Sequence, residues 1–121
     1  MKHPNFVLLY VLDPRASVAF YQEMLGRAPV EASDTFAMFA LDSGIMLGLW
    51  KREQVLPTVT AATGASELAI TVDDQAEVDR LHHLWQTRGI IILQTPCSMD
   101  FAYTFVATDL DGHRIRVFAP H

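Results

Sequence analysis

The sequence repeats one series of structural signals twice, and this duplication limits the possible folds more than any other feature. A strand-like apolar run begins each half, a helix with start and stop signals follows, and three further strand-like runs complete it. Aligning Asp13 with Asp74 brings Gly26 within two residues of Gly89. Each half has too little helix to bury a sheet by itself, so we expect the halves to combine into one fold.

Capping signals delimit the two predicted helices. Asp13 can cap the first helix, Pro14 suits its first position, and Gly26 can end it in the left-handed conformation. Asp74 and Glu77 have the spacing of a capping box at the start of the second helix. We expect helices over residues 13–26 and 73–89, and strands over residues 6–12, 29–32, 35–41, 45–51, 67–72, 90–94, 103–107 and 113–118.

Composition excludes several classes of function. The chain has 121 residues, a formal net charge of −5 and a pI of about 5.4, so no basic surface favours nucleic acid or an anionic membrane. No apolar run is long enough to span a bilayer, and the run before Asp13 is too short for a signal peptide. We therefore expect a cytoplasmic protein. Cys97 is the one cysteine, and we expect it to be an inert core or loop residue.

Strand alternation divides the side chains between two faces of each predicted sheet. In the second half, Leu68, Ile70 and Val72 form the apolar set that belongs under the helix, as do Ile115 and Val117 in the last strand. Carrying that parity into the first half gives one shared open face. Its expected members are Phe6, Leu8, Tyr10, Met46, Gly48, Trp50, Glu67, Ala69, Thr71, Arg114, Arg116 and Phe118.

The stretches "DPRASVAFYQEMLG", "GIMLGLW" and "FAYTFVATDLDGHRIRVFAP" resemble the vicinal oxygen chelate superfamily, which includes glyoxalase I, extradiol dioxygenases and bleomycin-resistance proteins. Within that superfamily they most resemble the drug-binding members that confer resistance to phenazine antibiotics. The resemblance implies an α+β fold in which two β-α-β-β-β modules form a curved, eight-stranded mixed sheet around a concave pocket. We expect one domain over residues 1–121, with module one at about 4–53, a linker at about 54–65 and module two at about 66–120.

The resemblance also implies where a metal would bind. Metal-dependent members take ligands from the first and fourth strand of each module, and the corresponding positions here are Phe6, Gly48, Glu67 and Arg116. Among these, Glu67 alone can coordinate a metal, and Arg116 is a permanent cation. We therefore expect no metal, no cofactor and no catalytic residue.

The same positions suit a binding pocket. Trp50 could stack on a planar ring, although an indole buried in a dimer contact is an alternative. Arg116 could pair with a ligand carboxylate or carbonyl, or with Glu67 in place of the missing metal, while Arg114 reads as a solvated charge. The expected ligand-binding residues are Trp50, Arg116, Tyr10, Phe6, Met46, Gly48, Glu67, Phe101, Tyr103 and Phe118, with Phe101 and Tyr103 as a lid or rim.

We expect a homodimer that sequesters a small planar aromatic compound, such as a phenazine-like antibiotic, in pockets at or near the subunit interface. The alternative is a metal-dependent glyoxalase-like lyase or dioxygenase with misplaced ligands, which stoichiometric metal in purified protein would reveal. A third possibility is a structural or regulatory module whose aromatic face is dimer interface. Trp85, which follows helical spacing with Val78 and Leu81, is expected in the core, and His113 is expected to stabilise a turn.

Overall fold

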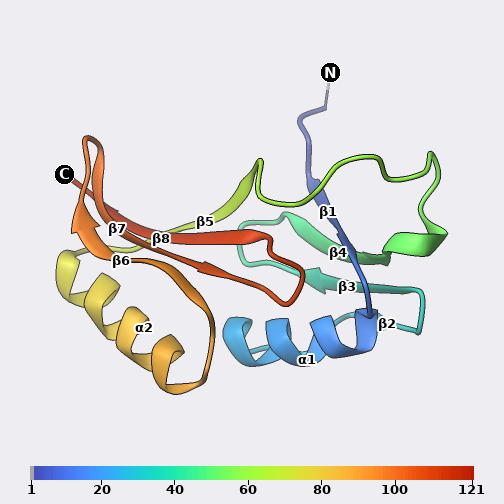
Figure 1. Cartoon of the computed structure of the whole chain (residues 1–121), viewed down its shortest axis with the longest axis horizontal. Coiled ribbons are helices and arrows are strands. Elements are labelled where there is room, and N and C mark those ends of the chain that lie inside the picture. The colour runs from blue at the N-terminus through green and yellow to red at the C-terminus, as the bar shows by residue number, and fades with distance from the viewer. Residues whose placement is uncertain (1) are drawn as a thin grey trace. The chain divides into compact units, whose positions relative to one another are not determined.

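The computed structural model describes residues 2–121 and divides them into two compact units. Unit 1 comprises the described residues up to Ala61, and unit 2 comprises Ala62–His121. Each unit contains one sheet and one α-helix in the order β-α-β-β-β (Figure 1). The α+β class and the duplicated order are confirmed, while the single-domain boundaries and the joining of the sheets into one surface stay predictions.

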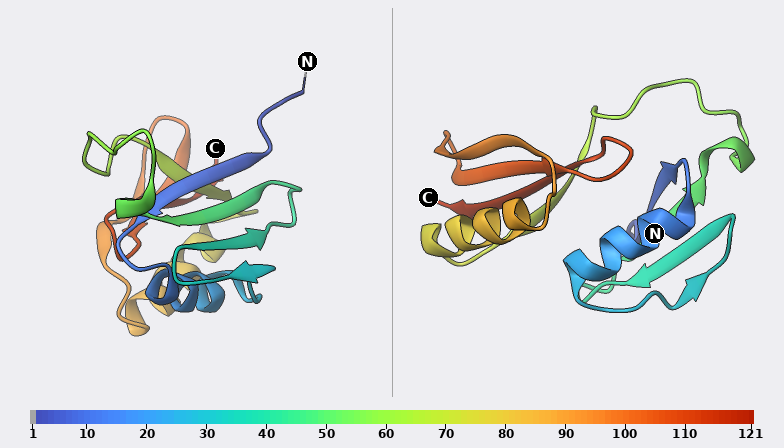
Figure 2. Two further views of the ribbon diagram at one scale, coloured as in Figure 1. Left: turned by 90° about the vertical axis from the view of Figure 1, so that its right-hand side faces the viewer. Right: turned by 60° about the horizontal axis from the view of Figure 1, so that its bottom comes forward.

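Unit 1 is a mixed, four-stranded sheet in the order β1-β4-β3-β2, with β1 parallel to β4 and the other pairs antiparallel. The helix α1 lies against one face of this sheet (Figure 2). The elements are β1 (Phe6–Val11), α1 (Pro14–Leu25), β2 (Glu31–Ala32), β3 (Phe36–Ala40), β4 (Met46–Lys51) and the short 3-10 helix η1 (Arg52–Gln54).

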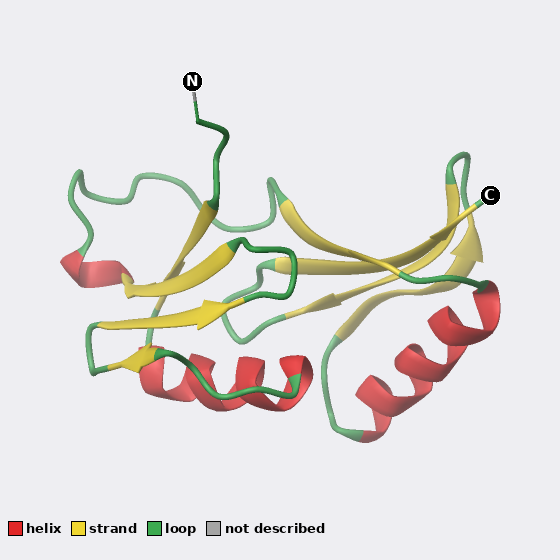
Figure 3. Cartoon of the chain, turned by 180° about the vertical axis from the view of Figure 1, so that it is seen from behind, coloured by secondary structure: helices red, strands yellow, loops and turns green. Residues whose placement is uncertain are grey.

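Unit 2 repeats this topology with the strand order β5-β8-β7-β6, and again the first and last strands of the unit are the parallel pair. The helix α2 covers one face of the sheet (Figure 3). The elements are β5 (Glu67–Thr71), α2 (Gln75–Thr87), β6 (Ile92–Ser98), β7 (Ala102–Thr108) and β8 (Arg114–Pro120). Neither α-helix in the described part of the chain is long and apolar enough to cross a membrane.

The predicted caps form at both helix starts. The Asp13 carboxylate accepts the N–H of Arg15 at 3.0 Å, and Gly26 ends α1 in the left-handed region at φ 70°. The Asp74 carboxylate accepts the N–H of Glu77 at 2.9 Å. A reciprocal capping box does not form through the Glu77 side chain, whose two oxygens instead accept bonds from Arg80 at 2.6 and 2.9 Å. The cap alone therefore fixes the start of α2.

The cores lie between each helix and its sheet. In unit 1, the helix residue Tyr21 is fully buried with the strand residues Phe39 and Leu47. In unit 2, Val78 and Trp85 of α2 are buried, and the Trp85 ring lies 5.3 Å from that of Phe105 in an edge-on contact. Each such side chain stabilises the fold by about 1.5–3 kcal/mol. The predicted core role of Trp85 is confirmed, and the opposite face of each sheet carries the open set.

The main departure from the expected strands is β6, which continues to Ser98 instead of ending at Gln94. Proline cannot donate a ladder hydrogen bond, so Pro96 interrupts the pairing inside this strand. The structure accommodates Pro96 where the β6–β7 register shifts between Gln94 and Cys97. Pairing resumes at Cys97, opposite Thr104, so the proline marks an irregularity inside a strand.

Candidate ligand-binding surfaces

Three aligned residue pairs build the open face of unit 1. The parallel register of β1 and β4 sets Phe6 beside Met46, Leu8 beside Gly48, and Tyr10 beside Trp50. The Tyr10 and Trp50 rings meet edge to face, with centroids 6.1 Å apart and planes at 78°. Five predicted site residues are thus neighbours on one face: Phe6, Tyr10, Met46, Gly48 and Trp50.

Gly48 has no side chain, so neighbouring apolar side chains can pack directly against the sheet at this position. A Cβ atom at this position would lie 2.7 Å from Leu8 Cδ2, 2.8 Å from Phe6 Cε1 and 3.1 Å from Phe36 Cζ. The first two distances are shorter than carbon atoms tolerate, so these side chains occupy the space that any other residue would fill. The missing side chain at Gly48 therefore shapes this face.

A hollow of about 370 Å³ lies on this face, lined by Phe6, Leu8, Phe36 and Trp50. Phe6 and Leu8 remain 40% and 45% exposed, which is unusual for such large apolar residues and marks a surface available for contact. Phe36 was missed at the sequence level because it belongs to β3, where no ligand position was assigned. Phe36 pairs with Trp50 across β3 and β4, and this pairing identifies it as a neighbour of the predicted site.

An ion pair dominates the open face of unit 2. Arg116 Nε donates to Glu67 Oε1 at 2.6 Å, and Arg116 Nη1 donates to Thr104 Oγ1 at 3.3 Å. The two charged side chains are 15% and 32% exposed, so the pair is partly shielded from solvent. In the same unit, the Phe101 and Phe118 rings meet edge to face with their centroids 5.8 Å apart. Two further predicted site residues are therefore in contact.

A polar hollow of about 300 Å³ also lies on unit 2, lined by Leu93, Gln94, Val106, Arg114 and Arg116. Arg114, expected to be a solvated charge, is exposed but borders this hollow. Gln94 was not among the predicted site residues, because β6 was given no ligand position and glutamine in a half-buried strand carries no distinctive signal.

Tyr103 lies apart from the other predicted site residues. Its hydroxyl donates to Asp79 Oδ1 of α2 at 2.7 Å, so the ring points to the helix side of the sheet. The hydrogen bond to Asp79, with some burial and the negative charge of Asp79, raises the pKa of Tyr103. Its neighbour Thr104 is the one that faces Arg116. The expected rim role for Tyr103 thus finds no support in its contacts.

The four positions that correspond to metal ligands do not fit a metal ion. In unit 1, Phe6 and Gly48 offer no donor atom, and in unit 2 the Glu67 carboxylate is held by the guanidinium of Arg116. A cation beside the one remaining carboxylate opposes the binding of a divalent ion. These residues therefore provide no Lewis-acid centre.

The turn before β8 holds the one group of side chains in the described residues with metal-ligand proximity. One donor atom from each of Asp109, Asp111 and His113 lies within 4.8 Å of the others. The Asp109 carboxylate, however, is already hydrogen-bonded within the turn. Its Oδ1 atom accepts the backbone N–H groups of Asp111 and His113, each at 2.9 Å. Oδ2 lies 2.8 Å from Nδ1 of His113. The geometry supports the predicted turn-stabilising role of His113.

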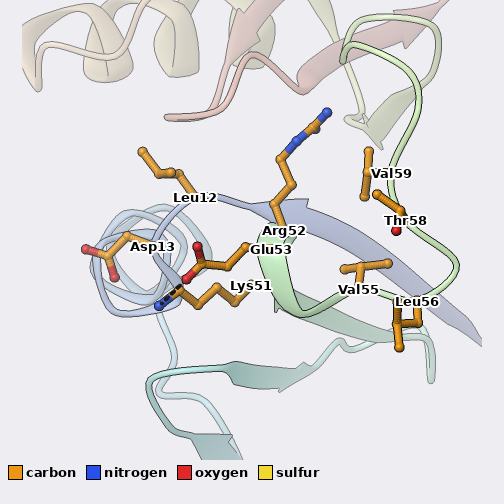
Figure 4. Close-up of a pocket in the computed structure, with 9 residues that line it drawn as sticks. All are labelled: Leu12, Asp13, Lys51, Arg52, Glu53, Val55, Leu56, Thr58 and Val59. Atoms are coloured by element: carbon orange, nitrogen blue, oxygen red, sulfur yellow. Dashed lines mark ion pairs between the residues drawn. The ribbon is translucent and has the colours of Figure 1, made fainter.

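A third hollow, of about 600 Å³, borders the end of β4 in unit 1 (Figure 4). Lys51 and Glu53 form an ion pair across 3.0 Å, and Arg52 extends away from that pair to donate to the carbonyl of Ala61 at 3.2 Å. No feature of the sequence predicted this hollow. Its residues are Leu12, Asp13, Lys51, Arg52, Glu53, Val55, Leu56, Thr58 and Val59.

Comparisons with known proteins agree with this architecture. A profile of the Glyoxalase/Bleomycin resistance protein/Dioxygenase superfamily matches residues 3–117. The phenazine antibiotic resistance protein EhpR of Enterobacter agglomerans is 28% identical over 117 residues, which cover 94% of this chain and 89% of EhpR.

Solved structures extend the comparison. The solution structure of protein ATC0852 from Agrobacterium tumefaciens is 46% identical, with a TM-score of 0.92 over 100% of this chain and 99% of that one. A glyoxalase-related enzyme from Fulvimarina pelagi is 25% identical, with a TM-score of 0.84 over 98% of this chain and 88% of that one. Enzymes and resistance proteins thus share this fold, and the fold alone does not decide between them.

Proposed function

The chain belongs to the glyoxalase/bleomycin resistance protein/dioxygenase superfamily, and on that premise we propose that it binds a small, planar, aromatic compound without transforming it. Sequestration of a phenazine-like antibiotic, and hence drug resistance, is the form of this function that we favour. The ligand class, the absence of catalysis and the resistance role are all part of the proposal.

The open aromatic face of unit 1 carries the proposal. Its hollow is lined by phenyl, indole and leucine side chains alone, and Phe6 and Leu8 are exposed enough to touch a ligand. Burying an aromatic ring against such a surface is favourable by about 25 cal/mol per Å² of apolar area. Ring stacking adds about 0.5–1.5 kcal/mol. Apolar burial and ring stacking are therefore the two contributions by which this surface would bind a planar ring.

Chemistry at the inherited metal positions supports binding over turnover. A metal-dependent member of the superfamily polarises its substrate with a Lewis acid. In this chain, the donors at those positions have been replaced by a ring, a glycine and a carboxylate–guanidinium pair. The likeness to EhpR, a phenazine antibiotic resistance protein, supports the proposed resistance role.

We propose that Arg116 provides a separate polar contact on the open face of unit 2. Its guanidinium is committed to Glu67 at 2.6 Å, so a ligand carboxylate or carbonyl would compete with that carboxylate for the same donors. Phe118 and Phe101 would add apolar contact beside this group, as their edge-on pairing places them together. Binding at this face of unit 2 would therefore favour ligands that carry an oxygen acceptor.

We further propose that the protein acts as a homodimer. Each sheet has a helix on one face only, and large apolar residues remain exposed on β1 of unit 1. A second copy is the partner that would remove such surface from water in every protein molecule. Light scattering during size-exclusion chromatography gives the mass directly, and a mass of 13.5 kDa across the micromolar range would refute the dimer.

Calorimetric titration with phenazine and phenazine-1-carboxylate tests the ligand proposal. Trp50→Leu should weaken both ligands by roughly tenfold, because it removes stacking while keeping an apolar side chain. Trp85→Phe is the matched control, since Trp85 is buried against Phe105 and should leave affinity unchanged. Unchanged binding by Trp50→Leu would remove the site assignment. Stoichiometric zinc, nickel, manganese or iron in purified protein would favour a metal-dependent enzyme instead.

A further inference from the structure

We propose that the polar hollow of unit 2 is a second binding site, specific for a carboxylate whose neighbouring atom bears an O–H or N–H group. The site consists of Gln94, Val106 and Arg114, with Leu93 and Arg116 at its borders. It uses no residue of unit 1, and its argument does not depend on the aromatic ligand proposed above, although Arg116 has a part in both proposals.

Sheet register brings the members of this site together. Gln94 of β6 pairs with Val106 of β7, and Val106 pairs with Arg116 of β8, so the three form one row across the strands. Arg114 precedes Arg116 by two residues and therefore lies on the same face. The row leaves an apolar floor at Val106 between an amide and two guanidinium groups.

Gln94 supplies the first reason to infer a ligand. Its Oε1 atom is buried, and no donor among the described residues reaches it. Buried acceptors are nearly always hydrogen-bonded, and an unsatisfied one in a native protein calls for an explanation. Gln94 lines the hollow, so rotation of its side-chain amide would present this atom to an O–H or N–H group of a ligand.

The charge balance supplies the second reason. Arg116 is neutralised by Glu67 at 2.6 Å, whereas no hydrogen bond or ion pair involves the Arg114 side chain within the described residues. Two guanidinium groups and one carboxylate leave one positive charge in excess at this face. A single carboxylate matches that excess, and the planar fork of Arg114 suits its two oxygens.

The size and lining limit the ligand class. A hollow of about 300 Å³ accommodates an acid with about one ring, and Leu93 and Val106 provide apolar contact for it. A 2-hydroxy acid or a 2-amino acid with a compact apolar group carries the required anion and donor on adjacent carbon atoms. We name Arg114 as the residue that binds the anion and Gln94 as the residue that selects the donor.

Non-aromatic probes separate this site from the aromatic surface, because a saturated ring cannot stack on Trp50. Nitrogen-15-labelled protein would be titrated with 1-hydroxycyclohexanecarboxylate, which has both groups. Cyclohexanecarboxylate lacks the donor, and 1-hydroxycyclohexanecarboxamide lacks the charge. We expect the hydroxy acid to bind most tightly and to shift the side-chain amide signals of Gln94. Equal binding of all three probes, or signal changes confined to unit 1, would overturn the proposal.

Matched variants assign the two roles. Arg114→Ala should weaken both acids by roughly three- to tenfold, and Arg80→Ala, which removes an exposed arginine of α2, should change neither. Gln94→Leu should weaken the hydroxy acid by roughly two- to tenfold and leave cyclohexanecarboxylate unchanged. The amide spectrum of each variant reports whether it folds. If Gln94→Leu weakened the two acids equally, Gln94 would have no selective role.

Gln94→Glu provides a second test that keeps the size and acceptor oxygens of the side chain. The added negative charge should weaken both acids and should not weaken the neutral carboxamide, whose O–H can donate to the new carboxylate. Trp50→Leu should bind all three probes as the wild type does, whatever its effect on phenazine. Loss of acid binding in Trp50→Leu would contradict the independence of this site, and loss of phenazine binding alone would leave it intact.

Discussion

Replacing Gly48 with alanine is the most direct way to alter the aromatic surface without disturbing the core beneath it. The new Cβ would lie 2.7 Å from Leu8 Cδ2 and 2.8 Å from Phe6 Cε1, so both side chains must move. The atoms that must give way are side-chain ends on residues that are 45% and 40% exposed. They can rotate toward solvent, which the buried side chains on the opposite face cannot do.

The expected stability change is small because opposing effects are similar in size. Crowding a packed core costs about 1–3 kcal/mol, and partial exposure places this site at the lower end of that range. Alanine recovers about 0.5–1 kcal/mol in a strand, because glycine loses more backbone entropy on folding. Gly48 does not have a positive φ, so alanine adds no backbone strain. The free energy of unfolding should change by no more than about 1 kcal/mol.

Ring binding should respond much more. Displacing Phe6 and Leu8 removes part of the hollow beside Trp50, and one lost ring contact of about 0.5–1.5 kcal/mol corresponds to roughly two- to tenfold weaker binding. Urea unfolding and calorimetric titration with phenazine measure the two effects separately. Ala32→Val, which adds methyl groups to an exposed strand of the same unit, is the control. Wild-type affinity in Gly48→Ala would show that rings do not bind at this face.

The remaining predictions concern unit 2. Glu67→Ala should free Arg116 and strengthen phenazine-1-carboxylate binding by roughly two- to fivefold while leaving phenazine unchanged, and weaker carboxylate binding would contradict the proposed competition. The bond to Asp79 raises the pKa of Tyr103 above its ordinary value of 10.0, so its stabilising effect is present below that pH and lost as pH rises through the higher value. Alkaline urea titrations should therefore show a steeper loss of stability in the wild type than in Tyr103→Phe, and parallel curves would refute the linkage. Asp109→Ala should cost about 2–4 kcal/mol of unfolding free energy, because two backbone N–H groups of the turn lose their acceptor. A loss below about 0.5 kcal/mol in urea would show that water replaces the carboxylate.

Much of the fold could be predicted from the sequence because its strongest signals are local. Caps at Asp13 and Asp74 and alternation along the strands depend on a few adjacent residues, and the structure confirms them. Alternation in β8 also placed Ile115 and Val117 in the core correctly, since a half-buried strand has only two faces.

The structure differs from expectation where the outcome depends on a partner distant in the sequence. Tyr103 looked like a rim residue, but Asp79 of α2 draws its hydroxyl to the helix side. Gln94 looked like the end of a strand, but β7 continues the ladder past the irregularity to Cys97. Cross-strand and helix–sheet contacts of this kind leave no periodic pattern, so local reading could not supply them.

Strand register gives the open faces of the two units the same construction. Phe6 aligns with Met46 and reaches toward Gly48, two residues farther along β4. Glu67 aligns with Arg114 and binds Arg116, again two residues farther along β8. The same diagonal therefore brings the first and fourth strands of each unit into contact. In metal-dependent relatives that diagonal would have to join donor atoms, whereas here one unit fills it with a ring over a glycine and the other with opposite charges. A ring over a glycine offers no lone pairs, and the Arg116 guanidinium competes with a metal ion for the Glu67 carboxylate, so neither unit offers a metal a set of free donor atoms.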